Sequence, residues 1–300
     1  MDGAAALFML EAAPRKSASR HPPAFNPCLT DRMFAFQPDS SVASDVVPSV
    51  NCGQRLNGRV PDMILLHYTG MLDAQAALQR LCSPDSKVSS HYVVFEDGRI
   101  TQCVPESERA WHAGASSWDG ETDINSCSIG IEIANPGHEF GYPDFPSRQI
   151  AAVIALCRGI IARRGIRPER VLAHSDVAPA RKQDPGEKFP WRLLSDSGVG
   201  LWLPPAPIDN GGAPLAAGAS GEAVRALQQN LADFGYGIAV SGAYDSATGE
   251  TVAAFQRHFR PARVDGKADE STCKTLAALL EKRRKSDELH ANAPAASPSP

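Results

Sequence analysis

Three side chains of metal-binding types lie at the ends of predicted sheet elements. His67 is near the end of a short apolar run at 63–68, His174 ends another at 171–174, and Asp184 lies in the loop that follows. Ligands at strand ends and on the adjoining loops can converge at one edge of a sheet. A catalytic zinc ion takes three protein ligands from His and Asp or Glu, and it keeps a fourth position for water. The three residues are therefore a candidate set for one Zn²⁺ ion.

Each residue of this set also has an ordinary structural explanation. A single His at a strand end commonly forms a structural hydrogen bond, and an Asp before a Pro is a common loop residue. The chain has no compact motif of the HExxH type, which places two ligands on one helix. The spacing by itself therefore leaves both metal binding and a structural role open.

Two charged residues would complete a hydrolytic site. Glu132 is a single carboxylate in an otherwise apolar strand pattern at 128–134, where an unpaired charge is costly. It would act as the general base that takes a proton from water. Lys182 stands two residues before Asp184 and would stabilise the oxyanion at an attacked carbonyl. The structural alternatives are a solvent-facing glutamate and a solvated loop lysine.

The segments that would position these residues alternate between strand and helix patterns. Strand patterns lie at 63–68, 91–104 (two strands joined at Asp97-Gly98), 128–134 and 171–174. Helical patterns lie around 76–81 and from Ser147 to Gly165. This order predicts an α/β fold with a mixed central sheet flanked by helices.

A second, helical unit follows a segment rich in Pro, Gly and Ala. Two stretches, from Val224 and from Val252, share the pattern Val-x-x-[Leu/Phe]-Gln, and a third apolar set lies at 276–280. These patterns predict a small three-helix bundle. The predicted organisation is a disordered leader at 1–48, a catalytic domain at 49–203, a linker at 204–219, the helical domain at 220–284 and a disordered tail at 285–300.

Composition narrows the class of protein. The 300 residues carry a formal net charge of −4, which gives no reason to expect nucleic acid as a partner. No apolar run has the roughly 18 residues of a membrane span. The N-terminal stretch is a poor secretory signal because Asp2 precedes its apolar part and Glu11 interrupts it. Met33 is an alternative start, and nothing in the sequence indicates the oligomeric state.

The cysteines give weak evidence on the compartment. Seven are scattered along the chain without a CxxC pair, so neither a zinc ribbon nor a disulfide framework is predicted. A reducing cytoplasm is favoured on this ground.

Several motifs, taken together and in order, resemble a known family. They are LLHYTG around His67, SSHYVVFEDGRITQCVPESERAWHAG from Ser89, SIGIEIAN around Glu132 and HSDVAPARKQDPGEKFPW from His174. Together they resemble the type 2 N-acetylmuramoyl-L-alanine amidases, in particular the AmpD/AmiD branch, over about 60–202. The resemblance implies a zinc hydrolase of the EC 3.5.1.28 type that cuts the amide bond between muramic acid and the stem peptide of peptidoglycan.

The same resemblance assigns expected roles to individual residues. Zinc would be held by His67, His174 and Asp184, with Glu132 and Lys182 in the catalytic roles above. The residues that match the family's substrate groove are Trp111, His112 and Asn135. His91, in the middle of the predicted hairpin, is interpreted as structural, and Tyr68 as a packing residue.

The helical unit resembles the peptidoglycan-binding type 1 domain. The residues that carry this resemblance are SGEAVRALQQNL from Ser220, VAAFQRHF from Val252 and VDG at 264–266. A wall-binding domain fits a periplasmic or wall-associated enzyme, so that location is the alternative to the cytoplasm. Peptidoglycan or a soluble muropeptide, with muramic acid intact or in its 1,6-anhydro form, is the expected substrate.

Two other functions fit the same scaffold. A non-catalytic peptidoglycan recognition protein would share the fold, although such proteins tend to lose a zinc ligand and this chain has the full set. A zinc hydrolase that cuts within the stem peptide would share the metal site.

Overall fold

The structure of the chain, a computed structural model, describes residues 36–208 and 212–291. The strands are β1 (Asp45–Val46), β2 (Cys52–Gln54), β3 (Met63–Tyr68), β4 (Tyr92–Val94), β5 (Ile100–Gln102), β6 (Glu108–Ala110), β7 (Ser128–Ile133) and β8 (Val171–Ala173). The helices are α1 (Ala74–Cys82), α2 (Ile124–Cys127), α3 (Ser147–Arg164), α4 (His174–Val177), α5 (Trp191–Asp196), α6 (Glu222–Phe234), α7 (Ser246–Phe259) and α8 (Glu270–Ala291).

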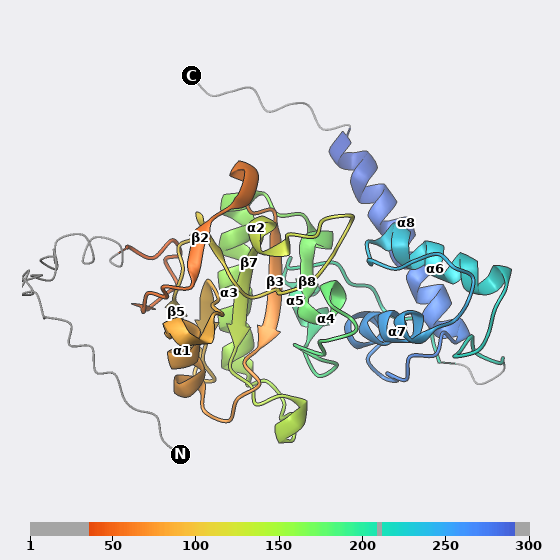
Figure 1. The fold of residues 1–300 in the computed structure, drawn as a ribbon, viewed down its shortest axis with the longest axis horizontal. Helices are drawn as coiled ribbons and strands as arrows, with labels where there is room; N and C mark the ends of the chain where they lie inside the picture. The colour runs from red at the N-terminus through yellow and green to blue at the C-terminus, as the bar shows by residue number, and fades with distance from the viewer. Residues whose placement is uncertain (1–35, 209–211, 292–300) are drawn as a thin grey trace, which may run out of the picture. The chain divides into compact units, whose positions relative to one another are not determined.

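A mixed sheet forms the centre of the first part of the chain. Its strand order is β1-β5-β4-β7-β3-β8 (Figure 1). The central strand β3 pairs in parallel with both β7 and β8, and β4 pairs in parallel with β7. Within this sheet only β4 and β5 are antiparallel, through the predicted hairpin, and β2 and β6 form a separate antiparallel pair. The predicted α/β class, a mixed sheet flanked by helices, is confirmed.

One face of the sheet packs on the long helix α3. In β3 the side chains of Ile64 and Leu66 face this helix, and the isoleucines of β7 do the same. Because β3 is buried on both faces, its sequence is a continuous apolar run and not an alternating one. Helix α3 ends where predicted, at Gly165, whose φ of 66° is a left-handed conformation that glycine adopts at no steric cost.

The opposite face packs on the C-terminal helices. Met63 and Leu65 of β3 belong to one buried cluster that also contains Trp118, Phe234 of α6 and Phe255 of α7. The packing is close, because a Cβ added at Gly235 would lie 2.6 Å from the ring of Trp118. The sheet and the helical unit therefore share a hydrophobic core.

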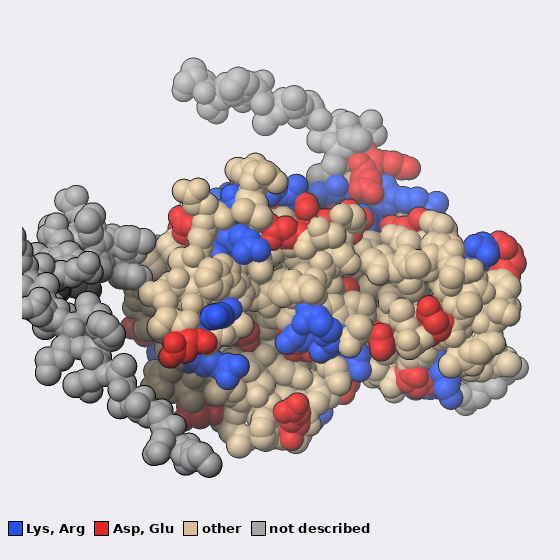
Figure 2. Space-filling view, viewed as in Figure 1, with Lys and Arg blue, Asp and Glu red and all other residues tan. Residues whose placement is uncertain are grey.

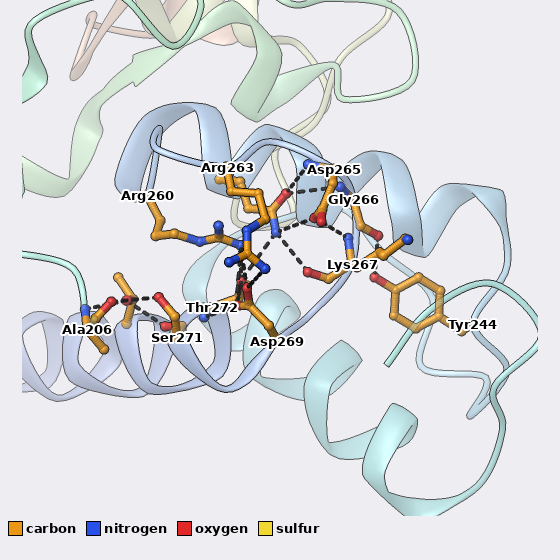
Figure 3. Close-up of polar contacts among 12 residues, drawn as sticks. Ala206, Tyr244, Arg260, Arg263, Asp265, Gly266, Lys267, Asp269, Ser271 and Thr272 are labelled. Carbon is orange, nitrogen blue, oxygen red and sulfur yellow. Dashed lines mark hydrogen bonds and ion pairs between the residues drawn. The ribbon is translucent and has the colours of Figure 1, made fainter. Parts of the chain in front are cut away.

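The C-terminal unit contains the three predicted helices α6, α7 and α8 (Figure 1). Polar contacts tie the loop between α7 and α8 to both helices (Figure 3). Asp269 caps α8 by accepting from the backbone N of Thr272 at 2.8 Å, and the Arg260 guanidinium donates to the Thr272 hydroxyl at 2.6 Å. The predicted linker is attached here too, since the Ser271 hydroxyl donates to the Ala206 carbonyl at 2.6 Å.

Part of the predicted disordered leader is folded. Residues 1–35, with the alternative start at Met33, lie outside the described residues, but 36–48 pack against the sheet. Strand β1 pairs in parallel with β5, and the Asp39 carboxylate accepts from Gln102 Nε2 at 2.6 Å and from the Glu106 backbone N at 2.9 Å. No local sequence pattern predicts this strand, because polar contacts, and not an apolar periodicity, hold the segment.

Two other element limits differ from the prediction. Helix α8 continues to Ala291, into the predicted tail, because polar residues that offer no apolar face form ion pairs along it, such as Lys285 with Glu281 at 3.3 Å. Strand β8 ends at Ala173, so His174 is the first residue of α4 and not the last of a strand.

Within the described residues, no helix has both the length and the apolar composition needed to cross a bilayer.

Candidate active site

The three predicted metal ligands converge on one point. His67 comes from β3, His174 from the start of α4, and Asp184 from the loop that follows, and all three are buried. Nδ1 of His67 lies 2.9 Å from Nδ1 of His174 and 3.2 Å from Oδ2 of Asp184, which in turn lies 3.0 Å from Nδ1 of His174. Two imidazole nitrogens and one carboxylate oxygen therefore form a small triangle.

Hydrogen bonds behind the two imidazoles fix which nitrogen faces the triangle. Nε2 of His174 lies 3.1 Å from the Ala113 carbonyl, which can only accept, so Nε2 carries the proton. Nε2 of His67 lies 3.1 Å from Nδ1 of His112, whose Nε2 lies 3.3 Å from the Ser128 hydroxyl. A neutral imidazole with its proton on Nε2 presents a lone pair on Nδ1, as metal binding requires.

Burial and the neighbouring charges keep His67 and Asp184 in their metal-binding forms. Burial, together with the neighbouring His174, lowers the pKa of His67 to about 4. Burial opposes ionisation of Asp184, but the adjacent His174 and His67 hold its pKa well below the usual range. At neutral pH the site therefore presents one uncharged imidazole at His67 and one carboxylate at Asp184.

The donor set fits zinc. Four-coordinate zinc with bonds of about 2.0–2.1 Å places its ligand atoms about 3.3 Å apart, close to the 2.9–3.2 Å seen here. Within the described residues, this is the one group of His, Cys, Asp or Glu side chains with the geometry of a metal site.

Glu132 faces the same space. It is paired in register with His67 across β7 and β3, so both side chains leave the same face of the sheet. Its Oε2 is buried and has no hydrogen-bond partner among the described residues. Burial raises the pKa of Glu132 well above its usual value, and the Asp184 charge adds to the effect while Lys182 opposes it. Burying a carboxylate without a hydrogen-bond partner is costly, so we expect this group to contact a ligand or to take part in the chemistry.

A cavity of about 270 Å³ joins these groups. All of the predicted site residues except Asn135 line it: His67, Trp111, His112, Glu132, His174, Lys182 and Asp184. Helix α1 supplies another wall through Ala77, Arg80 and Leu81. The arrangement joins a metal-binding triangle, a proton acceptor and an ammonium group in one concave space, as a hydrolase requires.

Comparison with known proteins identifies the family. Residues 57–187 match the model of the N-acetylmuramoyl-L-alanine amidase family, and residues 220–276 match the putative peptidoglycan binding domain. The N-acetylmuramoyl-L-alanine amidase AmiD of Escherichia coli is 40% identical over 248 residues, which are 73% of this chain and 82% of that protein. The chain belongs to the N-acetylmuramoyl-L-alanine amidase family.

Two solved amidase structures have the same fold over most of their length. The complex of AmiD from E. coli with anhydro-N-acetylmuramic acid-L-Ala-D-gamma-Glu-L-Lys superposes with a TM-score of 0.64 at 38% identity, covering 76% of this chain and 91% of that one. AmpDh3 of Pseudomonas aeruginosa gives a TM-score of 0.64 at 31% identity, covering 76% and 94%. The match extends beyond residue 208, because 76% of the 300 residues is more than the first 208 can supply.

Two of the residues predicted to bind substrate in this amidase have other contacts. The ring nitrogens of His112 are both occupied, by His67 and Ser128, and burial lowers its pKa well below the usual value. Asn135 lies outside the cavity, where its amide donates to the Pro143 carbonyl and accepts from the Gly137 backbone N, both at 2.9 Å. His112 thus contacts His67, one of the three candidate ligands, and Asn135 holds the loop after β7. The substrate-binding roles expected for both residues stay predictions.

Two residues outside the predicted set, Arg80 and Tyr68, also line the cavity. Arg80 has the pattern of a solvated helix residue, and no local signal distinguishes it from one. Tyr68 directly follows His67 and lines the cavity, and its hydroxyl lies 2.9 Å from Nδ1 of His138. His91 is structural as predicted, since it is fully buried and its Nδ1 accepts from the Gly130 backbone N at 2.9 Å.

Proposed function

We propose that this chain is a zinc-dependent N-acetylmuramoyl-L-alanine amidase that hydrolyses the amide bond between the lactyl group of muramic acid and L-alanine. The observation that supports it most directly is the triangle of His67, His174 and Asp184 beside the unpartnered carboxylate of Glu132. A zinc ion held by the three ligands would supply a Lewis acid that makes water acidic near neutral pH and polarises a carbonyl.

Glu132 is proposed as the proton carrier. A carboxylate at the wall of the cavity accepts a proton from the attacking water and returns it to the departing amine of L-alanine. Both proton transfers would use the same Oε2 atom, which has no hydrogen bond to the described residues. The burial that raises the pKa of this carboxyl makes it a better proton acceptor than a solvated glutamate.

Lys182 is proposed to stabilise the negative charge on the attacked carbonyl oxygen. Its side chain lines the cavity beside His67 and Asp184, and its positive charge acts on both Glu132 and His67. The positive ammonium group is already in place when negative charge develops on the carbonyl oxygen. The site therefore does not have to reorganise during the reaction.

Trp111 is proposed to contact the substrate. Its backbone N donates to the Ser89 hydroxyl at 2.8 Å, and its partly buried side chain lines the cavity. A flat aromatic surface there suits a sugar ring or the apolar part of a peptide.

The substrate class is proposed to be peptidoglycan or a muropeptide. The AmiD structure holds an anhydro-muramyl peptide, and residues 220–276 match a putative peptidoglycan binding domain. No nucleic-acid partner is proposed, because basic and acidic side chains are interspersed on the face drawn in Figure 2 and the net charge is −4. The sequence predicts domain limits of 49–203 for catalysis and 220–284 for wall binding, and we propose that the first domain also includes residues 36–48, which join the sheet, and that the second extends along α8 to Ala291.

Products of the purified, zinc-loaded enzyme test this function. The full-length chain is incubated with intact sacculi and, separately, with soluble anhydromuropeptides, and mass spectrometry identifies the products. We expect stem peptides that begin with L-alanine, and none from Glu132→Gln, which keeps the shape of the side chain but cannot accept the proton. Fragments cut within the stem peptide would indicate a different hydrolase, and zinc binding without cleavage would favour a recognition protein.

The compartment stays a prediction. The sequence favours a cytoplasmic location, and a periplasmic or wall-associated location is the alternative. The two predict that the full-length protein is found in different cell fractions. Cell fractionation with an antibody to the protein measures this directly.

A further inference from the structure

The short helix α4 carries a metal ligand yet cannot hold itself in place. It has four residues, His174–Val177, and begins with the ligand His174. A single helical turn is marginal in isolation, so its position depends on tertiary contacts. Asp176, in the middle of this turn, is fully buried and makes three of those contacts through its carboxylate.

Both oxygens of Asp176 are bound by the C-terminal helical unit. Oδ1 accepts from the Tyr236 hydroxyl at 2.8 Å, and Oδ2 accepts from Nδ1 of His258, on α7, at 2.7 Å. Oδ2 also accepts from the backbone N of Ala173, directly before the ligand, at 2.8 Å. The carboxylate therefore joins the residue that precedes His174 to two side chains more than sixty positions away.

The two partners of Asp176 are themselves fixed. His258 is buried and its ring stacks on that of Trp191, with centroids 3.7 Å apart and planes 24° apart. Tyr236 packs edge-on against Trp118 at 4.9 Å. Helix α4 contacts α7 directly (Figure 1). Asp176 thus lies between rigid aromatic groups and not against a mobile surface.

A displacement of α4 would disturb two metal ligands together. The backbone N of Ser175 donates to the carbonyl of Asp184 at 3.0 Å, so the helix and the second ligand move as one. The Nδ1 atom of His174 must stay within about 0.5 Å of its place for productive metal geometry. The contacts that hold Asp176 therefore act on the triangle as a whole.

From these contacts, and on the basis of the proposed zinc site, we propose that His258 and Tyr236 are positioning residues for His174 that act through Asp176. The C-terminal helical unit is then a structural component of the metal centre as well as a wall-binding domain.

The test removes these hydrogen bonds in the full-length protein without removing the aromatic rings. Tyr236→Phe removes one hydroxyl, and His258→Phe keeps a ring between Trp191 and Phe259. The control is Tyr244→Phe, the same change in the same unit, where the hydroxyl donates at 2.7 Å to the Gly266 carbonyl and not to α4 (Figure 3). Zinc affinity, measured by competition with a chromophoric chelator, and binding to sacculi are recorded for each variant.

We expect the Tyr236→Phe/His258→Phe double variant to bind zinc roughly 10- to 100-fold more weakly, the range found when residues that orient a metal ligand are replaced. Tyr244→Phe should keep wild-type affinity, and all variants should bind sacculi equally. The His258→Asn variant places an N–H close to the former Nδ1. It should therefore bind zinc more tightly than His258→Phe, with an affinity near that of the wild type. Where the double variant does not fold, Tyr236→Phe alone is compared with Tyr244→Phe.

Equal zinc affinity in the wild type and the Tyr236→Phe or double variant would overturn the proposal. So would a loss in Tyr244→Phe as large as in Tyr236→Phe, because the effect would then be general destabilisation of the helical unit. Absence of zinc binding by the wild type is a different result, since it would overturn the proposed zinc site itself.

Discussion

At the scale of single residues, the site combines groups whose protonation states are set by their surroundings. His67 and His174 offer lone pairs because their other nitrogens are engaged, and Glu132 is kept without a protein partner. Lys182 places a positive charge beside Glu132 and His67, and this charge lowers the pKa of both. The chemistry thus depends on a few side chains whose individual removal has separable effects.

Replacing Lys182 with Ala should lower kcat by about 10²–10³, the usual cost of losing one oxyanion donor. Zinc affinity should be nearly unchanged, because the ammonium is not among the ligands. Steady-state kinetics and zinc content are measured together. Lys285→Ala, the same change on the exposed part of α8, serves as the control. Unchanged turnover in a zinc-loaded Lys182→Ala enzyme would contradict the assigned role.

His91 should make stability depend on pH. Its burial, with the nearby Arg55 charge, lowers its pKa to about 3 in the folded protein, against about 6.5 in the unfolded chain. Between these values the unfolded chain binds a proton that the folded one does not, so stability is complete above about pH 6.5 and falls as the pH decreases. The contribution of His91 is a loss of about 2 kcal/mol between pH 7 and pH 5.

Urea unfolding at the two pH values measures this effect. The free energy of unfolding of the wild type should fall by about 2 kcal/mol more than that of His91→Gln, which cannot take up the proton. The difference between the two proteins removes the contribution of the carboxyl groups. Equal pH dependence in both would mean that His91 titrates normally in the folded protein.

At the scale of elements, β7 supports the site with its glycine as much as with its glutamate. A Cβ added at Gly130 would lie 2.5 Å from the His112 ring, the ring that bonds to His67. The strand thus leaves space for His112 on the face from which Glu132 enters the cavity. Gly130 thus leaves room for the His112 ring, and Glu132, two residues later, places its carboxylate in the same cavity.

Gly130→Ala should therefore weaken zinc binding roughly 10-fold or more, by displacing the ring that orients His67, and should cost about 1–3 kcal/mol of stability through overpacking. Gly53→Ala on β2 is the matched control, because nothing lies within 4 Å of a Cβ there. Zinc competition and thermal unfolding are measured for both. A Gly130→Ala protein with wild-type zinc affinity would show that His67 does not need the His112 contact.

At the scale of the whole molecule, the proposed metal site joins segments that are far apart in the chain. Its ligands come from β3 and from the segment after β8, and the C-terminal helices pack on the same face of the sheet. A ligand that binds only the folded chain should therefore stabilise the whole of it.

Zinc removal should lower the melting temperature. A free zinc concentration 1,000-fold above Kd contributes about 4 kcal/mol, so a chelator should lower Tm by about 10 °C for a chain of this size. Calorimetry with and without chelator measures the shift. His174→Ala is the control, since its Tm should be insensitive to the chelator. An equal shift in both proteins would place the effect outside this site.

The sequence by itself determined the elements and the types of the chemical groups. The apolar run before His67, the alternation around Glu132 and the stripe that ends at Gly165 are local patterns, and a backbone hydrogen-bonding pattern follows from local spacing. Residue types alone also predicted which side chains suit zinc, because metal preference is a property of the donor atom.

Only the tertiary structure decided which groups meet. His112 supports His67 and Asn135 holds a loop, although both match the substrate groove of the family by sequence. Residues 36–48 join the sheet through polar contacts, and Asp176 meets Tyr236 and His258 from a different part of the chain. Such pairs leave no trace in local periodicity, because each partner is chosen by packing between segments distant in sequence.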